Sequence, residues 1–185
     1  MAATRADMLD RKTGGAIPIT ASMSFRDGMA RLASAVHIIT TDGPAGRYGF
    51  TATAVCSVSD APPTLLVCVN TAASSLNALL ANGTLCVNML ASDQQPVARA
   101  FGNGQPMSER FATGEWSMRA GGSPQLAGAL MRFNCSIRSV VEQGSHQVLF
   151  CAVNGIVSGE PDDGSLVYFD RKYHALPSGG SAKGT

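Results

Sequence analysis

The fold is decided by two long apolar stretches near the end of the chain, ALMRFNCSIRSVVEQ (residues 129–143) and SHQVLFCAVNGIVSG (residues 145–159). Both are rich in β-branched residues and partly alternate between apolar and polar side chains, so each is predicted to be a strand. The strand–helix–strand order that a doubly wound parallel sheet requires is missing after residue 102. The two stretches therefore favour an antiparallel arrangement.

Earlier in the chain, β-branched segments punctuated by Gly and Pro predict further strands. These strands cover residues 36–42, 48–58, 64–70 and 84–90, and a last short strand covers 166–170. The segment 102–128 is rich in glycine and is expected to be irregular. Five or six long strands with few helices predict a mainly β protein, an antiparallel barrel.

Three short helices are expected beside these strands. Ser24 can cap an amphipathic first helix, whose apolar stripe is formed by Phe25, Met29, Leu32 and Val36. A second helix begins at Ser74 or Ser75 and runs through Leu80, where Asn82-Gly83 ends it. The third extends from about Asp93 to Phe101.

Length and composition predict a single domain. The 185 residues are 45% apolar and only 15% charged, which provides one sizeable core. We expect a flexible extension over residues 1–22, the domain over 23–177 and a flexible Gly/Ser tail over 178–185. The apolar fraction exceeds what one small barrel hides, which favours a homodimer.

Charge and cysteine content limit the partners and the compartment. Lys and Arg number 14 against 13 Asp and Glu, without runs of like charge, so neither nucleic acid nor an anionic membrane is implied. No apolar run is long enough for a membrane span or a secretory signal, which predicts a cytoplasmic protein. The five cysteines are odd in number and lack C-x-x-C spacing, which argues against disulfides and zinc.

Standard catalytic motifs are missing from the sequence: it contains no phosphate loop, no G-x-G-x-x-G opening a helix, no G-x-S-x-G and no H-E-x-x-H. Candidate binding residues therefore come from less specific segments. Residues 49–63 combine small side chains with the hydroxyls of Thr51, Thr53, Ser57 and Ser59. They can hold a flat heterocycle against backbone N–H groups, or simply form a solvated edge strand.

A second segment, residues 70–79, leads from a strand into a helix that opens with Ser74 and Ser75. A helix start with hydroxyls suits a phosphate, but ordinary N-capping explains the same residues. Of the histidines, His37 lies inside an apolar strand as a core or edge residue, whereas His146 follows a Gly144-Ser145 turn and can reach a ligand. His174 lies among aromatic residues in a cluster that suits a ligand or a dimer interface. The three scattered histidines make no metal site.

Several motifs in the same order resemble one known family. They are FRDGMARLASAVHIITTDGPAGRYGFTATAVCSVSDAPPTLLVCVN (25–70), ERFATGEW (109–116), the Gly-Ser-His turn (144–146) and LVYFDRKYHAL (166–176). The sequence resembles the short-chain NAD(P)H:flavin oxidoreductases, the reductase components of two-component flavin monooxygenases. Within them it is most similar to the reductase component of 4-hydroxyphenylacetate 3-monooxygenase, followed by the pyrimidine-utilisation flavin reductase.

The resemblance implies an FMN-binding split barrel, an antiparallel Greek-key barrel that dimerises with the flavin near the interface. It implies that the edge of the flavin ring is lined by Thr51, Ala52, Thr53 and Ala54. The ribityl chain and phosphate would be contacted by Ser57, Val58 and Ser59, and the phosphate also by Asn70, Ser74 and Ser75.

By the same resemblance, His146 lies beside flavin and nicotinamide as the catalytic residue. The pocket rim would be completed by Tyr168, Arg171, Tyr173 and His174. Phe101 would shield the ring and Arg110 would hold a nicotinamide-side phosphate. Many relatives carry Asp where this chain has Ser145, so no carboxylate of that turn orients His146 here.

The implied activity is hydride transfer from NADH, or NADPH, to FMN or FAD, with NADH favoured. The reduced flavin would pass to a partner flavin-dependent monooxygenase or halogenase. Because the cofactors supply the chemistry, no catalytic motif is needed. Three alternatives remain: an oxidase of the pyridoxamine-phosphate type, a non-enzymatic flavin- or haem-binding barrel, and a plain dimeric interaction barrel.

Overall fold

The computed structural model describes residues 24–118, 122–159 and 164–178. Residues 1–32 and 33–185 form two compact units, and each is described by itself. The predicted extension over residues 1–22 lies outside the described residues, and so does the predicted tail beyond Ser178. These two predictions therefore stay untested.

In the first unit, helix α1 (Phe25–Ala30) begins where the sequence predicts. Ser24 caps it, because its Oγ accepts from the Asp27 N–H at 3.2 Å while Oδ2 of Asp27 accepts from the Ser24 N–H at 3.0 Å. The helix is shorter than predicted, since it ends at Ala30. The apolar stripe does not continue in helical form, because the N–H of Val36 donates to the carbonyl of Leu166 in a sheet at 3.0 Å.

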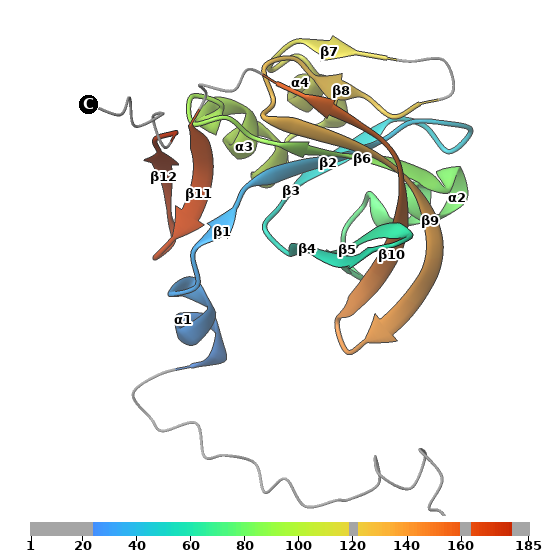
Figure 1. Ribbon diagram of the computed structural model, residues 1–185, viewed down its shortest axis with the longest axis horizontal. Helices are drawn as coiled ribbons and strands as arrows, with labels where there is room; N and C mark the ends of the chain where they lie inside the picture. The colour runs from blue at the N-terminus through green and yellow to red at the C-terminus, as the bar shows by residue number, and fades with distance from the viewer. Residues whose placement is uncertain (1–23, 119–121, 160–163, 179–185) are drawn as a thin grey trace, which may run out of the picture. The chain divides into compact units, whose positions relative to one another are not determined.

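The second unit is built on a seven-stranded antiparallel sheet in the order β3-β2-β6-β9-β10-β5-β4. Its strands are β2 (His37–Thr41), β3 (Tyr48–Ala52), β4 (Val55–Asp60), β5 (Pro63–Asn70), β6 (Thr84–Met89), β9 (Met131–Gln143) and β10 (His146–Ser158). The two edge strands, β3 and β4, are joined by only two residues, so the sheet must curl until its edges meet there (Figure 1). The predicted antiparallel barrel is confirmed.

The prediction of one strand over 48–58 is wrong in one respect. The segment forms two strands, because β3 pairs with β2 and β4 pairs with β5 at the opposite edge of the sheet. Residues 53 and 54 between them carry the chain across the split. A continuous β-branched pattern records strand propensity but does not show which partner each half has.

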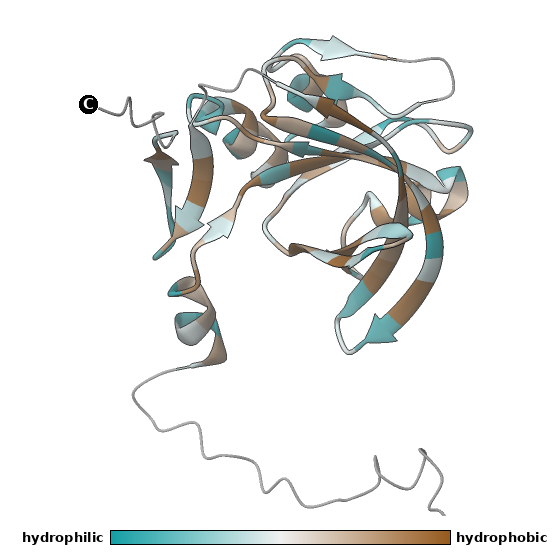
Figure 2. Cartoon of the chain, in the orientation of Figure 1, coloured by the Kyte–Doolittle hydropathy of each residue, from teal (hydrophilic) through white to brown (hydrophobic). Residues whose placement is uncertain are grey.

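The long hairpin β9–β10 determines the curvature of the sheet. Its pairing is interrupted by register shifts between Phe150 and Cys151 and between Val153 and Gly155, and such bulges bend a strand. This bending lets β9 pair with β6 on one side while β10 pairs with β5 on the other. Apolar and polar bands alternate along both strands, and the hairpin tip is hydrophilic (Figure 2).

Smaller elements surround this sheet. They are β1 (Ser34–Ala35), α2 (Leu76–Asn82), α3 (Gln95–Gly102), α4 (Met107–Phe111), β7 (Trp116–Ser117), β8 (Gln125–Leu126), β11 (Ser165–Phe169) and β12 (Lys172–Leu176). The sequence predicts neither α4 nor the β7–β8 pair in the segment expected to be irregular, and it does not predict β12 after the last predicted strand at 166–170. No helix in the described ranges is long and apolar enough to cross a membrane.

Two apolar clusters form the core. The first fills the curled sheet with side chains from β2, β5, β6, β9 and β10, including Ile39, Val67 and Leu149. The second joins β2 to α3 and β8, around Ile38 and Phe101.

Candidate active site

Three chain segments meet at one end of the barrel. The connection between β3 and β4 exposes Thr53 and Ala54, and the carbonyl of Ala54 accepts from the Cys68 N–H of β5 at 3.0 Å. Two residues further along β5, Asn70 is paired with His146, the first residue of β10. The pairing register thus brings three predicted site segments together.

The turn that carries His146 is held firmly at its backbone. Gly144 has φ +56° at the first position of a two-residue turn, a conformation that favours glycine. The carbonyl of the next residue, Ser145, accepts from both the N–H and the Oγ1 of Thr71, at 3.0 and 3.1 Å. The loop after β5 therefore fixes the hairpin tip.

His146 itself is exposed at this tip, as the sequence predicts from the turn before it. Its Nδ1 lies 3.0 Å from the Oγ of Ser145. A neutral hydroxyl therefore contacts the imidazole. The second ring nitrogen, Nε2, lies on the other side of the ring and is available to a ligand.

The start of α2 follows directly on β5. The side chain of Asn70 accepts from the Ala72 N–H at 2.8 Å, and its carbonyl accepts from the Ala73 N–H at 2.9 Å, so a tight turn leads into the helix. Ser74 is exposed, but Ser75 is only 2% exposed and makes no capping bond with its side chain. Of the two predicted phosphate hydroxyls, only that of Ser74 can reach a ligand in this conformation.

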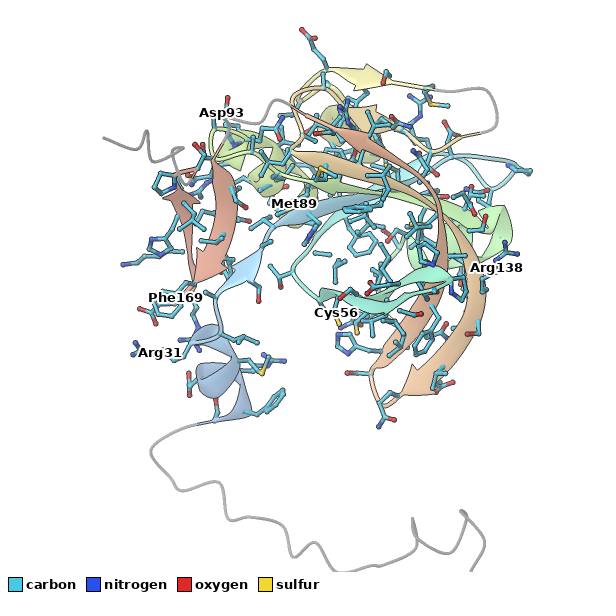
Figure 3. All side chains as sticks on the ribbon, viewed as in Figure 1. Arg31, Cys56, Met89, Asp93, Arg138 and Phe169 are labelled. Atoms are coloured by element: carbon cyan, nitrogen blue, oxygen red, sulfur yellow. The ribbon has the colours of Figure 1, made fainter. Side chains whose placement is uncertain are left out.

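The predicted contacts on β4 lie further from His146. β4 is an edge strand on which Ser57 and Val58 are exposed, which agrees with the solvated-edge alternative. Ser57 and Ser59 line a mostly apolar cleft of about 430 Å³ together with Cys56, which is labelled on β4 in Figure 3. The rest of its lining includes Leu65, Val87, Met89, Phe133, Val153 and Ile156.

His37 also lines this cleft and is a buried core residue, which is one of the two positions that the sequence predicts for it. It is 8% exposed, and its Nδ1 has no hydrogen-bond partner among the described residues. Burial lowers the pKa of His37 to about 4, although the nearby backbone of Ala52 and Ala35 opposes the shift. The ring is therefore neutral at physiological pH.

Helix α3 connects the first part of the predicted site to the C-terminal aromatic cluster. Thr51 donates its Oγ1 hydrogen to the carbonyl of Ala98 at 2.7 Å, so this hydroxyl is already used. The next residue, Arg99, lies with its guanidinium 5.6 Å from the ring centroid of Tyr173. Tyr173 in turn packs edge-on against Tyr168, at 5.0 Å between centroids.

The remaining residues of the C-terminal aromatic cluster are part of the β11–β12 hairpin. Asp170 and Arg171 occupy its two-residue turn with φ values of +48° and +62°. His174 is exposed, and its Nε2 lies 3.2 Å from the carbonyl of Phe169. Phe169 on β11 and Cys56 on β4 lie well apart in Figure 3, so this hairpin and β4 do not share one pocket wall within a single chain.

Phe101 occupies a different position from the one the resemblance implies. It is 2% exposed and packs against the rings of Phe111 and Trp116, at 5.1 and 5.2 Å between centroids. Its ring also approaches Gly49 so closely that a Cβ there would lie 2.7 Å from Cε1. Phe101 is therefore a core residue and has no free face to shield a flavin ring.

Arg110 likewise has a structural role. It is 8% exposed, and its Nε donates to the carbonyl of Gln105 at 2.7 Å while Nη1 donates to those of Gly49 and Phe101 at 2.9 and 3.2 Å. Burial lowers the pKa of this guanidinium. Its Nε and Nη1 are committed to three carbonyls, which anchors the Arg110 side chain inside the fold.

Two residues near the site were not predicted. Thr71 directly follows Asn70, and the strand-to-helix junction was the only signal that could have pointed to it. Arg99 carries no local signal, because its partner Tyr173 is distant in sequence. When the side-chain amide of Gln95 is turned with its oxygen toward Arg99, this oxygen accepts from Nε and Nη2 of Arg99 at 3.0 and 2.7 Å.

The described residues offer no cluster of three or more His, Cys, Asp or Glu that could hold a metal ion. Three of the cysteines, Cys86, Cys135 and Cys151, are buried, and burial raises the pKa of the Cys86 and Cys151 thiols to about 12. Burial raises the pKa of Cys135 still further. These thiols behave as apolar core groups.

Comparison with known proteins shows the family of the chain. A family model described as a flavin reductase like domain matches residues 29–177. The FMN reductase (NADH) RutF of Methylorubrum populi is 53% identical over 174 residues, which cover 92% of this chain and 85% of that protein.

Two solved structures extend the likeness to the fold. A flavin reductase from Haemophilus somnus has a TM-score of 0.79 at 43% identity, covering 82% of this chain and 97% of its own. BorF, the flavin reductase component of a bacterial two-component tryptophan halogenase, has a TM-score of 0.76 at 30% identity, covering 82% and 96%. The curled antiparallel sheet, the Gly-Ser-His turn and these likenesses together show that the chain belongs to the family of flavin reductase like domains.

Proposed function

We propose that this protein is an NADH-dependent flavin reductase with FMN as its preferred flavin. The observation that carries the proposal is that the same end of β5 is flanked by small, exposed residues, Thr53 and Ala54, on one side and by the exposed imidazole of His146 on the other. The preference for NADH and FMN follows the name of the RutF relative from Methylorubrum populi. When bound, NADH supplies a hydride from C4 and the flavin accepts it at N5.

The chain's own residues have to bind and orient two rings. Small side chains at Thr53 and Ala54 let a flat ring lie against the backbone. Along the edge strand, Ser57, Val58 and Ser59 would contact the ribityl chain. At the other side, Asn70 and Ser74 would contact the phosphate with neutral groups, and His146 would direct Nε2 toward the nicotinamide.

The C-terminal aromatic residues and the oligomeric state belong to the same proposal. In a homodimer, Tyr168, Arg171, Tyr173 and His174 of one protomer would form the rim of a pocket that a single chain leaves open. Thr51, Ala52, Ser75, Phe101 and Arg110 are not assigned direct side-chain contacts, because they are buried or already hydrogen-bonded. The dimer is tested by sedimentation at micromolar concentration, where a monomer would contradict it.

We further propose that the reduced flavin leaves for a partner oxygenase in the cytoplasm. BorF, a structural neighbour, is the reductase component of a two-component halogenase. The proposed contacts at this site are mostly neutral, and few charged anchors suit a flavin that is bound and released rather than retained. A flavin-dependent monooxygenase or halogenase is the expected acceptor.

The activity is tested by mixing the purified full chain with NADH or NADPH and with FMN or FAD, and following the nicotinamide absorbance. NADH with FMN is expected to give the highest kcat/KM. Reactions without added flavin are the matched control. No oxidation with any pair would refute the proposal, and flavin retained through gel filtration without oxidation of NADH would indicate a non-enzymatic flavin carrier.

A further inference from the structure

The Gly-Ser-His turn contains a hydrogen-bonded chain that the proposed reaction has not yet used. It begins at the end of β5, where the carbonyl and side chain of Asn70 hold a tight turn around Thr71. Thr71 donates twice to the carbonyl of Ser145, through its N–H at 3.0 Å and its Oγ1 at 3.1 Å. Ser145 in turn places its Oγ 3.0 Å from Nδ1 of His146.

Each hydrogen bond in this series restricts the motion of the residue that follows it. Two donors on one carbonyl fix the peptide of Ser145 relative to β5, and its Oγ then contacts the imidazole. A contact at Nδ1 limits rotation of an exposed ring, which otherwise samples several rotamers. The ring is thereby held with Nε2 as its free nitrogen.

The chemistry of a hydroxyl matters at this position. A carboxylate only accepts, so it would retain a proton on Nδ1. A serine hydroxyl both donates and accepts, so it can keep its hydrogen bond whether Nδ1 or Nε2 carries the proton. Its effect on His146 is therefore orientation without an added negative charge beside the hydride-transfer site.

We infer that Ser145 is a positioning residue for His146 and that Thr71 acts through Ser145, so that the end of β5 sets the direction of the imidazole. The inference rests on the proposed function for its kinetic consequence but not for its structural content. Because Asn70 belongs to the proposed phosphate contacts, the same chain links the phosphate end of the site to the imidazole.

The kinetic test compares four single variants and one double variant of the full chain with NADH and FMN. Ser145→Ala is expected to lower kcat about five- to tenfold, with the Kd for FMN within about twofold, because the ring loses its orientation but no flavin contact is removed. Ser145→Thr retains the hydroxyl and should restore kcat to within about twofold. Ser158→Ala, which removes an exposed serine at the far end of β10, is the matched control and should equal the parent.

Thr71→Val keeps the N–H donor and the side-chain volume but removes Oγ1, and is expected to lower kcat about twofold to threefold. Combined with Ser145→Ala, it should add nothing, because both act through the same hydroxyl. Additive losses would overturn the role of Thr71. A Ser145→Ala variant that matches Ser158→Ala, or one that loses FMN affinity as much as kcat, would overturn the role of Ser145.

A spectroscopic experiment tests the positioning role of Ser145 even if the protein oxidises no NADH. The ring nitrogens of His146 are recorded by long-range ¹H–¹⁵N NMR on the flavin-free protein and assigned with His146→Ala. Ser145→Ala is expected to shift the Nδ1 resonance of His146 and to leave His37 unchanged, while Ser145→Thr keeps the parent value. An unchanged Nδ1 resonance in Ser145→Ala would overturn the positioning role, whereas a shift without any turnover would leave it standing and refute only the proposed function.

Discussion

The turn around His146 and the cluster formed by Phe101, Arg110, Phe111 and Trp116 differ in what their polar groups contact. At the turn, backbone bonds fix the chain while the imidazole stays exposed. In the aromatic cluster, the guanidinium of Arg110 is buried and donates only to backbone carbonyls. The resemblance to the family points to both regions, but only the turn can offer a side chain to a ligand.

This difference separates residues that can contact a ligand from residues that stabilise the fold. A buried cation that donates to three backbone carbonyls stabilises the loops that cross it, and removing it deprives those carbonyls of that donor. An exposed histidine contributes little to folding, so its orientation by Ser145 has value mainly for a bound molecule. Substitutions in the two regions should therefore affect different measurements, and four predictions test that separation.

The largest effect is expected for Phe101→Ala. Emptying a fully buried aromatic site should lower the free energy of unfolding by about 3–5 kcal/mol, as measured by urea denaturation. Leu176→Ala, at a 54% exposed apolar position, is the control and should change it by less than about 1 kcal/mol. If Phe101→Ala kept its stability and lost only flavin affinity, the aromatic cluster would have to be reassigned to the binding site.

His37 extends the comparison to a second histidine, which is buried, whereas His146 is exposed. Its pKa of about 4 in the folded protein lies below the unfolded value of 6.5, so the unfolded chain binds the proton first as the pH falls. Stability is therefore intact above about pH 7 and decreases toward pH 4, by up to about 3 kcal/mol.

The measurement is urea unfolding across that pH range for the parent and His37→Gln. His37→Gln is expected to lose this part of the pH dependence. Parallel slopes for the parent and His37→Gln would contradict the assignment of the slope to His37.

Arg110→Met is expected to cost about 2 kcal/mol of unfolding free energy, because three carbonyls lose their donor while the aliphatic volume is largely kept. Arg138→Met, at an exposed arginine on β9, is the control and should have little effect. The KM for NADH measured on folded Arg110→Met should equal that of the parent. A selective rise in KM without loss of stability would return Arg110 to the cofactor site.

The smallest free-energy change is expected for His146→Ala, and it should appear in the reaction rather than in folding. We expect single-turnover hydride transfer to slow about tenfold, which is about 1.4 kcal/mol, while the Kd for FMN stays within about twofold. Unfolding free energy should change by less than about 0.5 kcal/mol. Equal losses in rate and in flavin affinity would contradict a role on the nicotinamide side.

Most of the strands could be predicted because β-branched residues and Gly/Pro punctuation are local signals. The hairpin β9–β10, the strands β2, β5 and β6 and the start of α1 lie where the sequence places them. The failures share one cause. Whether residues 48–58 pair with one neighbour or two, and whether 102–128 contains short elements, depends on contacts with distant segments.

The residues of the candidate site also divide into those that local sequence places correctly and those whose burial depends on distant contacts. The Gly144-Ser145 turn marks His146 as exposed at a strand start, and the structure agrees. The burial of Ser75, Phe101 and Arg110 leaves no local trace, since serine opens many helices and arginine is usually exposed. Their environment is created by the packing of α3, α4 and β3.

By itself, the sequence determined the antiparallel strands, the family resemblance and the position of one histidine at a tight turn, because each depends on residues that are neighbours in the chain. Only the tertiary structure decided that β3 and β4 lie at opposite edges of one curled sheet, that Arg110 serves three carbonyls and that Thr71 holds Ser145 against His146. These contacts join segments far apart in sequence. Their geometry follows from strand register and core packing, which local propensity does not specify.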